Sequence, residues 1–269
     1  MLKLNDPTLL RTKNFINGEW VDGSSGTVDV TNPANGKVVA TIANGSADDA
    51  SRAVEAASKA FLSWSRMPAK QRAVLLRNWF NLLMANADDL GAIMTAEQGK
   101  PLSESIGEVS YGAGFIEYYA EESKRVMGHT IPTISNDRRL QTYKQPVGVV
   151  GCITPWNFPN AMIARKAGPA LGAGCTIVIK PATETPLSAL AMCELADRAG
   201  IPKGVISVVV GDDSRGIGAV LTQHPKIGKF TFTGSTPVGK ILMKQCADGV
   251  KKVSLELGGN APFIVFDDA

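Results

Sequence analysis

Four short segments carry polar or glycine residues in positions suited to ligand binding, and each follows an apolar run typical of a strand. They read TPWNFP from Thr154, KPATETP from Lys180, VVGDDSRG from Val209 and FTGSTPVG from Phe232. In a parallel sheet the carboxyl ends of the strands lie at one edge, where ligands bind. These segments are therefore the candidates for a functional site.

Three residues in or near these segments have side chains suited to catalysis or cofactor binding. Asn157 stands between Pro155 and Pro159, and its amide could stabilise an oxyanion without titrating, although such residues are often only turn formers. Lys180 ends the segment TIVIK, where its ammonium could reach a ribose or a phosphate; the alternative is a lysine whose stem packs on the surface. Glu256 precedes two glycines, which leave space for a ligand beside its carboxylate. Taken singly, none of the three decides between a ligand site and a structural role.

The segment GSTPVGK at 234–240 fits the G-x-x-x-x-G-K pattern of a phosphate-binding loop. Ile241 follows, where such a loop needs a hydroxyl for Mg²⁺, and Pro237 lacks one of the N–H groups that would bind phosphate. A P-loop triphosphatase is therefore disfavoured. The turn at Gly234 and Ser235 could still bind one phosphate of a nucleotide at a helix N-terminus, or it could be a plain strand-to-helix turn.

Composition excludes several classes of protein. The 269 residues carry 28 Lys and Arg against 25 Asp and Glu, a net charge of +3, and no basic cluster is longer than a pair, so nucleic acid is not expected as a partner. No apolar run approaches the roughly 20 residues that span a bilayer, and the N-terminus lacks the apolar core of a signal peptide. We therefore expect no membrane contact and a cytoplasmic location.

Cysteine and histidine usage argues against a zinc site and against a Ser-His-Asp hydrolase. The cysteines are far apart with no C-x-x-C pair, the histidines are isolated, and no G-x-S-x-G segment occurs. We expect no metal, and we interpret the cysteines as reduced, buried thiols. The residues concerned are Cys152, Cys175, Cys193, Cys246, His129 and His224.

The first half of the chain reads as short strands followed by helices. FINGEWV and VDVTNPANGKVVATI are cut by turns, which predicts strands between Phe15 and Thr41. Ser46 can cap one helix, Pro68 can open a second, and helices are expected over 87–98 and 102–125. Residues 128–145 read as two extended segments on either side of a polar turn, which predicts a hairpin.

After Pro146 strands and helices alternate. The apolar segments VGVVGCI, TIVIK, VISVVV and KFTFT are separated by helical patterns near 161–171, 188–199 and 217–222, and another begins at about Thr236. Near-continuous apolar strands between helices indicate a parallel sheet covered on both faces. The predicted fold class is therefore α/β, with a doubly wound parallel sheet.

These segments together resemble the aldehyde dehydrogenase superfamily. Four segments occur in the order that the superfamily has: TPWNFP, the KP turn after TIVIK, FTGSTPVG and LELGG. The likeness also includes INGEW, NPANGKVVA and EQGKP at 97–101, and it covers essentially the whole chain. The stretches WNFPNAMIARKAGPALGAGCTIVIKPATETP and LELGGNAPFIVFDDA look most like succinate-semialdehyde dehydrogenases, with glutarate-semialdehyde enzymes as near relatives. The resemblance implies a Rossmann-like dinucleotide-binding domain over 1–127 and 147–269 and a β-hairpin oligomerisation arm over 128–146.

The resemblance implies NAD(P)-dependent oxidation of a small-molecule aldehyde in a homo-oligomer. In the family a cysteine thiolate forms a thiohemiacetal, hydride passes to the nicotinamide, and a water activated by a glutamate hydrolyses the thioester. Asn157 takes the role of oxyanion donor, Glu256 that of general base and Arg165 that of substrate-carboxylate ligand. The residues implied for the cofactor are Ile153, Thr154, Pro155, Trp156, Lys180, Pro181, Ala182, Thr183, Gly211, Gly234, Ser235 and Leu257.

The family's nucleophile has no counterpart here. It lies in a G-Q-x-C segment well beyond the glutamate, and only 13 residues follow Glu256. We therefore expect the catalytic domain to be absent from this chain and the chain alone to be inactive. Two hypotheses remain: the chain is the first part of a semialdehyde dehydrogenase, or it is a truncated product that only binds dinucleotide.

Thr183 indicates the choice of cofactor. Similar NAD-preferring enzymes tend to have a glutamate at this position, whose carboxylate binds ribose hydroxyls and repels a 2′-phosphate. The smaller Thr183 leaves room for that phosphate, with Lys180 placed to pair with it and the Thr183 hydroxyl to donate to it. Glu184 could restore discrimination, but we expect it to face away. NADP is the predicted cofactor, and NAD remains possible.

Arg165 lies in AMIARK, on the helix that follows the first candidate segment. A guanidinium binds a carboxylate through two parallel N–H···O bonds, and similar semialdehyde dehydrogenases have an arginine at this position. The alternative is an ordinary surface arginine.

Overall fold

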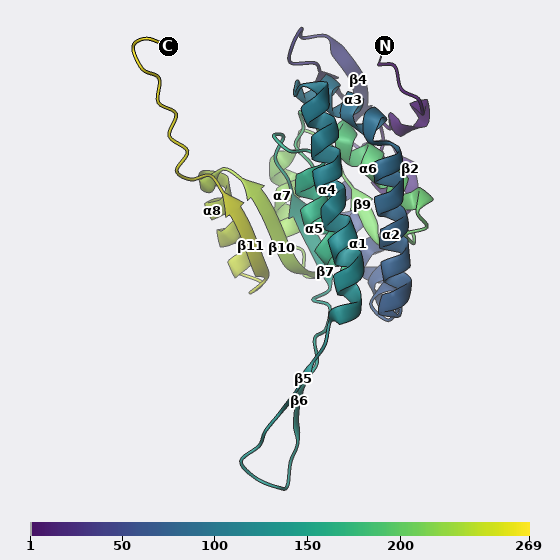
Figure 1. Ribbon diagram of the computed structural model, residues 1–269, viewed down its shortest axis with the longest axis vertical. Coiled ribbons are helices and arrows are strands. Elements are labelled where there is room, and N and C mark those ends of the chain that lie inside the picture. The colour runs from purple at the N-terminus through teal and green to yellow at the C-terminus, as the bar shows by residue number, and fades with distance from the viewer. Residues whose placement is uncertain (1) are drawn as a thin grey trace.

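A mixed seven-stranded sheet forms the centre of the molecule, and the computed structural model describes residues 2–269 around it (Figure 1). Five strands run parallel in the order β11, β10, β7, β8, β9. The chain passes from β7 to β8 and β9 and then crosses to β10 on the other side of β7, so the doubly wound α/β fold is confirmed. The five strands are β7 (Val149–Ile153), β8 (Thr176–Lys180), β9 (Ile206–Val208), β10 (Ile227–Gly234) and β11 (Lys252–Leu257).

The predicted strands of the first half are present, and two of them extend the central sheet. Strands β1 and β2 form an antiparallel pair, and β1 lies antiparallel to β9 through Phe15 and Val208. The sequence indicated these strands but not their joining the parallel sheet. Their bounds are β1 (Asn14–Ile16), β2 (Glu19–Val21), β3 (Thr27–Thr31) and β4 (Val38–Ala43), of which β3 and β4 form a separate ribbon.

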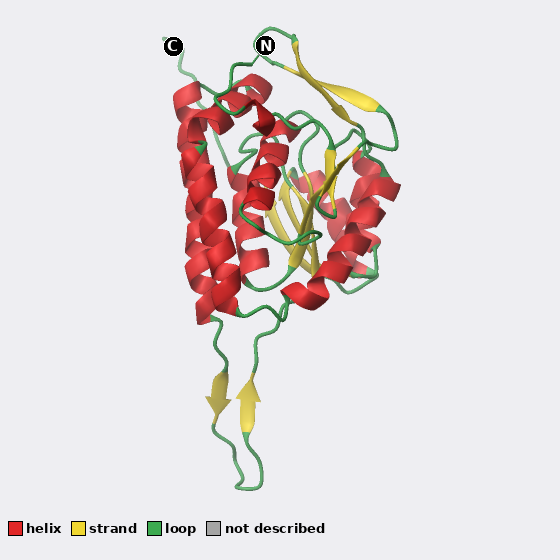
Figure 2. Ribbon diagram, turned by 90° about the vertical axis from the view of Figure 1, so that its right-hand side faces the viewer, coloured by secondary structure: helices red, strands yellow, loops and turns green. Residues whose placement is uncertain are grey.

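Strand β8 separates two apolar cores. Ile177 and Ile179 belong to the core with α5 (Ala161–Gly172) and α6 (Pro186–Arg198). Val178 belongs to the core with α1 (Ala47–Trp64) and α7 (Ser214–Gln223). Because successive side chains of a strand point to opposite faces, the cores lie on the two sides of the sheet. Figure 2 shows helices on both sides of the yellow strands. Helices α2, α3 and α4 pack outside α5 and α6 as an outer layer.

Helix boundaries follow the sequence signals closely. Ser46 caps α1 in a reciprocal capping box with Asp49, and α2 begins directly after Pro68. Gly99, at φ 85°, ends α3 in the left-handed conformation that favours glycine. The helices are α1 (Ala47–Trp64), α2 (Ala69–Ala85), α3 (Ala87–Gln98), α4 (Leu102–Glu122), α5 (Ala161–Gly172), α6 (Pro186–Arg198), α7 (Ser214–Gln223) and α8 (Thr236–Ala247), with short 3₁₀ turns at Pro7–Leu9 and Ser123–Arg125.

The outermost parallel strand, β11, is covered on one face only. Val253 and Leu255 pack against the core beneath α8, whereas Lys252, Ser254 and Glu256 are exposed on the opposite face. This alternation differs from the continuous burial of β8. The expectation of helices on both faces therefore holds for the middle of the sheet and is wrong for this edge.

A buried carboxylate joins the outer layer to the inner one. Glu97, at the end of α3, accepts hydrogen bonds from the backbone N–H groups of Leu187 and Ser188 at 2.7 and 2.8 Å, and from the Ser188 hydroxyl. Helix α6 has no side-chain cap of its own, so Glu97 satisfies its free donors. Burial raises the pKa of Glu97 to about 8, against the lowering effect of these hydrogen bonds.

The C-terminal end of α5 is bound from the outer layer as well. Arg72 of α2 is buried, and its Nε and Nη2 donate to the carbonyl oxygen of Gly172 at 3.4 and 3.3 Å. A cation here complements the negative end of the helix dipole. Burial lowers the pKa of Arg72.

The predicted hairpin projects away from the body of the molecule (Figure 1). Strands β5 (His129–Ile131) and β6 (Leu140–Thr142) pair antiparallel, and every residue of both strands is exposed. Their outer edges therefore carry free N–H and C=O groups beside the exposed side chains of Ile131 and Leu140.

We predict that this hairpin causes the chain to self-associate. Replacing Ile131 and Leu140 together by lysine places charge on the edge strands, which opposes strand pairing. Sedimentation velocity at high concentration should show a dimer or larger species for the unaltered chain and a smaller average mass for the double variant. Leu62→Lys removes a more exposed apolar side chain from α1 and serves as the control. A clean monomer of the unaltered chain would contradict the prediction.

Candidate functional site

The strand register brings the four candidate segments to one edge of the sheet. Ile153 at the end of β7 pairs with Lys180 of β8 and with Phe232 of β10. Gly234 pairs with Leu257 at the end of β11. The loops after these strands therefore lie side by side at the switch point between β7 and β10, where open α/β sheets bind ligands.

Thr183 and Gly211 connect two of these loops. The Thr183 hydroxyl donates to the Gly211 carbonyl oxygen at 2.9 Å. Gly211 has φ 152°, and a Cβ there would lie 2.7 Å from the Gly45 carbonyl oxygen, so the position requires glycine. The Thr183 hydroxyl would have to give up this bond to donate to a phosphate, and that donation stays a prediction. Its oxygen can still accept a hydrogen bond, and Glu184 is exposed.

Lys180 and Thr154 have polar groups that the chain itself leaves largely unsatisfied. Lys180 is 3% exposed, and the one hydrogen bond of its ammonium to a described residue runs to Pro181 O at 3.2 Å. Burial lowers its pKa, and nearby carboxylates, Glu184 first among them, oppose the shift. The buried Thr154 hydroxyl has no partner among residues 2–269. A buried cation and a free hydroxyl at a switch point fit the ribose and phosphate groups of a dinucleotide.

The start of α8 offers further donors at the same edge. Ser235 is the N-cap of α8, and its exposed side chain makes no capping hydrogen bond. The first backbone N–H groups of the helix can therefore bind an anion. Leu257 lies against α8 so closely that a Cβ on Gly239 would be 2.4 Å from it. The remaining predicted cofactor residues line these loops: Ile153, Pro155 and Ala182 are half-buried, Pro181 is buried and Trp156 is exposed.

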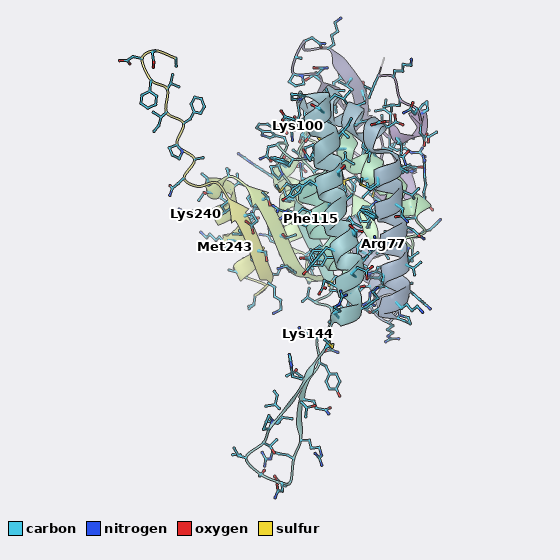
Figure 3. The ribbon with its side chains drawn as sticks, in the orientation of Figure 1. Arg77, Lys100, Phe115, Lys144, Lys240 and Met243 are labelled. Carbon is cyan, nitrogen blue, oxygen red and sulfur yellow. The ribbon has the colours of Figure 1, made fainter. Side chains whose placement is uncertain are left out.

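A cleft of about 580 Å³ runs along the open face of the outer strands, and it brings Arg165 and Glu256 together. Lys166 also lines it; this side chain is 7% exposed, donates to the Thr231 hydroxyl at 3.0 Å, and has a pKa lowered by burial. The cleft is bordered by Phe115 of α4, which is labelled in Figure 3.

The Arg165 guanidinium is supported by aromatic side chains. It lies 5.0 Å from the centre of the Phe115 ring and donates to the Tyr111 hydroxyl at 3.2 Å. No carboxylate pairs with it within the part of the chain that the structure describes. A half-buried guanidinium with free donors is suited to binding an anionic group.

Asn157 is exposed and does not line this cleft. Its side-chain oxygen accepts from the Phe158 N–H at 3.1 Å, which leaves the amide donors free. Its backbone carbonyl oxygen accepts from Lys100 Nζ at 3.0 Å and from Gln98 Nε2 at 3.4 Å. The sequence reasoning missed these two side chains, although both lie in the EQGKP segment.

The four cysteines are free and buried, as the sequence interpretation expected. Burial raises the pKa of Cys152 to about 12 and raises those of the other three thiols as well. The thiolate needed for attack on a carbonyl is therefore disfavoured at all four positions. Within residues 2–269, no group of three or more His, Cys, Asp or Glu side chains could hold a metal ion, and no helix is long and apolar enough to cross a membrane.

A doubly wound sheet with these groups at its switch point defines a dinucleotide-binding α/β protein. The family model described as aldehyde dehydrogenase family matches residues 20–269, and the chain belongs to this family. The resemblance carried by its motifs is thereby confirmed.

Relatives with assigned activities match over the whole chain. The chain is 58% identical to a succinate-semialdehyde dehydrogenase [NADP(+)] of Escherichia coli, over 100% of this chain and 56% of that protein. It is also 58% identical to a 3-sulfolactaldehyde dehydrogenase of Pseudomonas putida, over 100% of this chain and 55% of that protein. A crystal structure of an aldehyde dehydrogenase from Brucella melitensis superposes with a TM-score of 0.96 at 56% sequence identity. The superposition covers 100% of this chain and 56% of that chain. The chain thus spans about half the length of the curated relatives it matches.

Proposed function

We propose that this chain is the dinucleotide-binding part of a semialdehyde dehydrogenase, which oxidises succinate semialdehyde or a similar aldehyde to the acid. The observation that carries the proposal is the unpaired Arg165 guanidinium in the same cleft as Glu256. Succinate semialdehyde has a carboxylate at the end remote from its aldehyde, and a guanidinium fits that group. The names of the two relatives support an aldehyde substrate of this kind.

The roles of the residues follow from their chemistry. Asn157 has free amide donors that would stabilise the oxyanion of a tetrahedral intermediate. Glu256 would accept a proton from the water that hydrolyses the thioester of the cysteine in the completed enzyme. Thr154, Lys180 and the Gly234-Ser235 turn would hold the dinucleotide. When bound, that cofactor supplies the hydride acceptor.

We further propose a division of the chain into two parts. Residues 1–127 and 147–269 form the dinucleotide-binding domain, and residues 128–146 form an oligomerisation arm. The exposed, paired strands of the hairpin support the second assignment.

The isolated 269-residue chain should show no aldehyde dehydrogenase turnover. Its thiols are buried and protonated, so Glu256 has no thioester to hydrolyse. The measurement is NAD(P)H formation from succinate semialdehyde, with and without Glu256→Ala. Steady NAD(P)H formation that this substitution abolishes would overturn the prediction.

Arg165→Leu in the completed enzyme should lower kcat/KM for succinate semialdehyde by about 10- to 100-fold, because a charge-assisted pair contributes ~1.5–3 kcal/mol. An uncharged aldehyde of equal length should be affected far less. Arg125→Leu removes an exposed arginine that is paired with Glu122, and it is the matched control. An equal loss for both aldehydes would reject the role of Arg165.

The chain should bind NADP more tightly than NAD, by roughly tenfold, since Lys180 can form a charge-assisted hydrogen bond with the 2′-phosphate. Thr183→Glu should reverse this preference, because its carboxylate would repel the phosphate and accept from ribose hydroxyls. Asp248→Asn is the control and should change little, since it removes an exposed carboxylate at the end of α8 remote from the Ser235 turn. Titration with both dinucleotides at matched ionic strength tests the prediction; tighter binding of NAD to the unaltered chain would refute it.

A further inference from the structure

The backbone of the Asn157 loop is held by a lysine from another part of the chain. Lys100, which is labelled in Figure 3, lies between α3 and α4. Its ammonium donates to the Asn157 carbonyl oxygen at 3.0 Å. The same ammonium lies 3.9 Å from the centre of the Phe158 ring. Lys100 therefore contacts both the residue proposed to donate to the oxyanion and the residue after it.

The lysine is itself held in place on both sides. Its side chain is 11% exposed and pairs with Glu108 Oε2 at 2.5 Å. Gly99 ends α3 just before it, and Pro101 follows it directly and restricts its backbone conformation. Removing one partner of such a buried ion pair strongly destabilises the folded protein, because the other charge is left without a counter-charge.

Glu108 also binds the other end of the same loop. Its second oxygen, Oε1, accepts from the N–H groups of Asn160 and Ala161 at 3.0 and 3.1 Å. The Asn160 side chain makes no capping bond to α5, so Glu108 supplies the acceptor for that helix start. One carboxylate, 1% exposed, thus holds Lys100 with one oxygen and the beginning of α5 with the other.

We propose that Lys100 and Glu108 are positioning residues for the Asn157 amide. They fix the loop from its carbonyl at Asn157 to its N–H groups at Asn160 and Ala161, and so they fix the direction in which the free amide donors point. This inference rests on the proposed oxyanion role of Asn157. Misplacement of such a donor by about 1 Å can cost ~10²-fold in rate.

The test uses the completed enzyme and three variants of lysine residues. Lys100→Met should lower kcat by about 10- to 100-fold while KM and the Kd for NADP change less than about threefold, because the Lys100 ammonium is already bound by Glu108 and by the Asn157 carbonyl oxygen. Lys100→Arg keeps the charge and the donors and should restore most of the activity. Lys124→Met breaks an exposed pair with Glu121 at the end of α4 and should leave kcat unchanged. An unchanged kcat in Lys100→Met would overturn the inference.

A double-mutant cycle separates this inference from the proposed function. If Lys100 acts through Asn157, Lys100→Met should have little further effect on kcat in an Asn157→Ala background. If the two losses multiply, the positioning role is refuted and the oxyanion role of Asn157 stands. If Asn157→Ala alone leaves kcat unchanged, the proposed function of Asn157 fails and the positioning role falls with it.

Glu108→Gln provides a second route if Lys100→Met does not fold. Its Oε1 can still accept from Asn160 and Ala161, so hydrogen exchange at these two amides should stay slow. The charge that holds Lys100 is lost, so kcat should fall as it does in Lys100→Met. Unchanged kcat in a folded Glu108→Gln enzyme would contradict the inference.

Discussion

Two helices that follow strands of the sheet begin without side-chain caps of their own, and buried glutamates of the outer layer supply what they lack. Glu97 accepts from the first N–H groups of α6, and Glu108 does so for α5. Free N–H groups at a helix start attract negative charge, which offsets part of the desolvation of each carboxylate. The opposing effects are visible at Glu97, where burial prevails and raises the pKa to about 8. The loops after β7 and β8 end at these helices, so the candidate site depends on both glutamates.

The same constraint explains how a surface loop can hold a defined geometry. The segment from Trp156 to Phe158 is exposed, and exposed loops are usually mobile. Here the carbonyl of Asn157 is bound by Lys100, and the start of α5 by Glu108, so both sides of the exposed turn are anchored to buried groups. The loop is therefore accessible to a ligand and yet restrained. Arg72 binds the opposite end of α5, which fixes the helix that also bears Arg165.

Local signals in the sequence were sufficient to predict most elements. Apolar periodicity and caps such as Ser46 and Pro68 placed the helices within a few residues, because these signals act over one turn. Contacts between different elements could not be predicted from these local signals. Three contacts illustrate this: β1 with β9, Thr183 with Gly211, and Lys100 with Glu108. In each the partners belong to different elements or loops, and periodicity relates only residues within one element. Most of the residues proposed for the site stand in loops at strand ends, which the sequence pattern could indicate, whereas Lys100 and Glu108, which hold one of these loops, come from another layer.

The origin of these caps bears on how the chain folds. Glu108 lies 52 residues before Asn160 along the chain, and Glu97 lies 91 residues before Ser188. The outer helices α3 and α4 precede α5 and α6 in the chain, so the first turns of α5 and α6 become fully hydrogen-bonded only when they dock against these outer helices. Contacts of such long range slow folding and make it more cooperative. The sheet and the outer helices should thus become protected from solvent exchange together, as one cooperative unit, with the hairpin over 128–146 outside it.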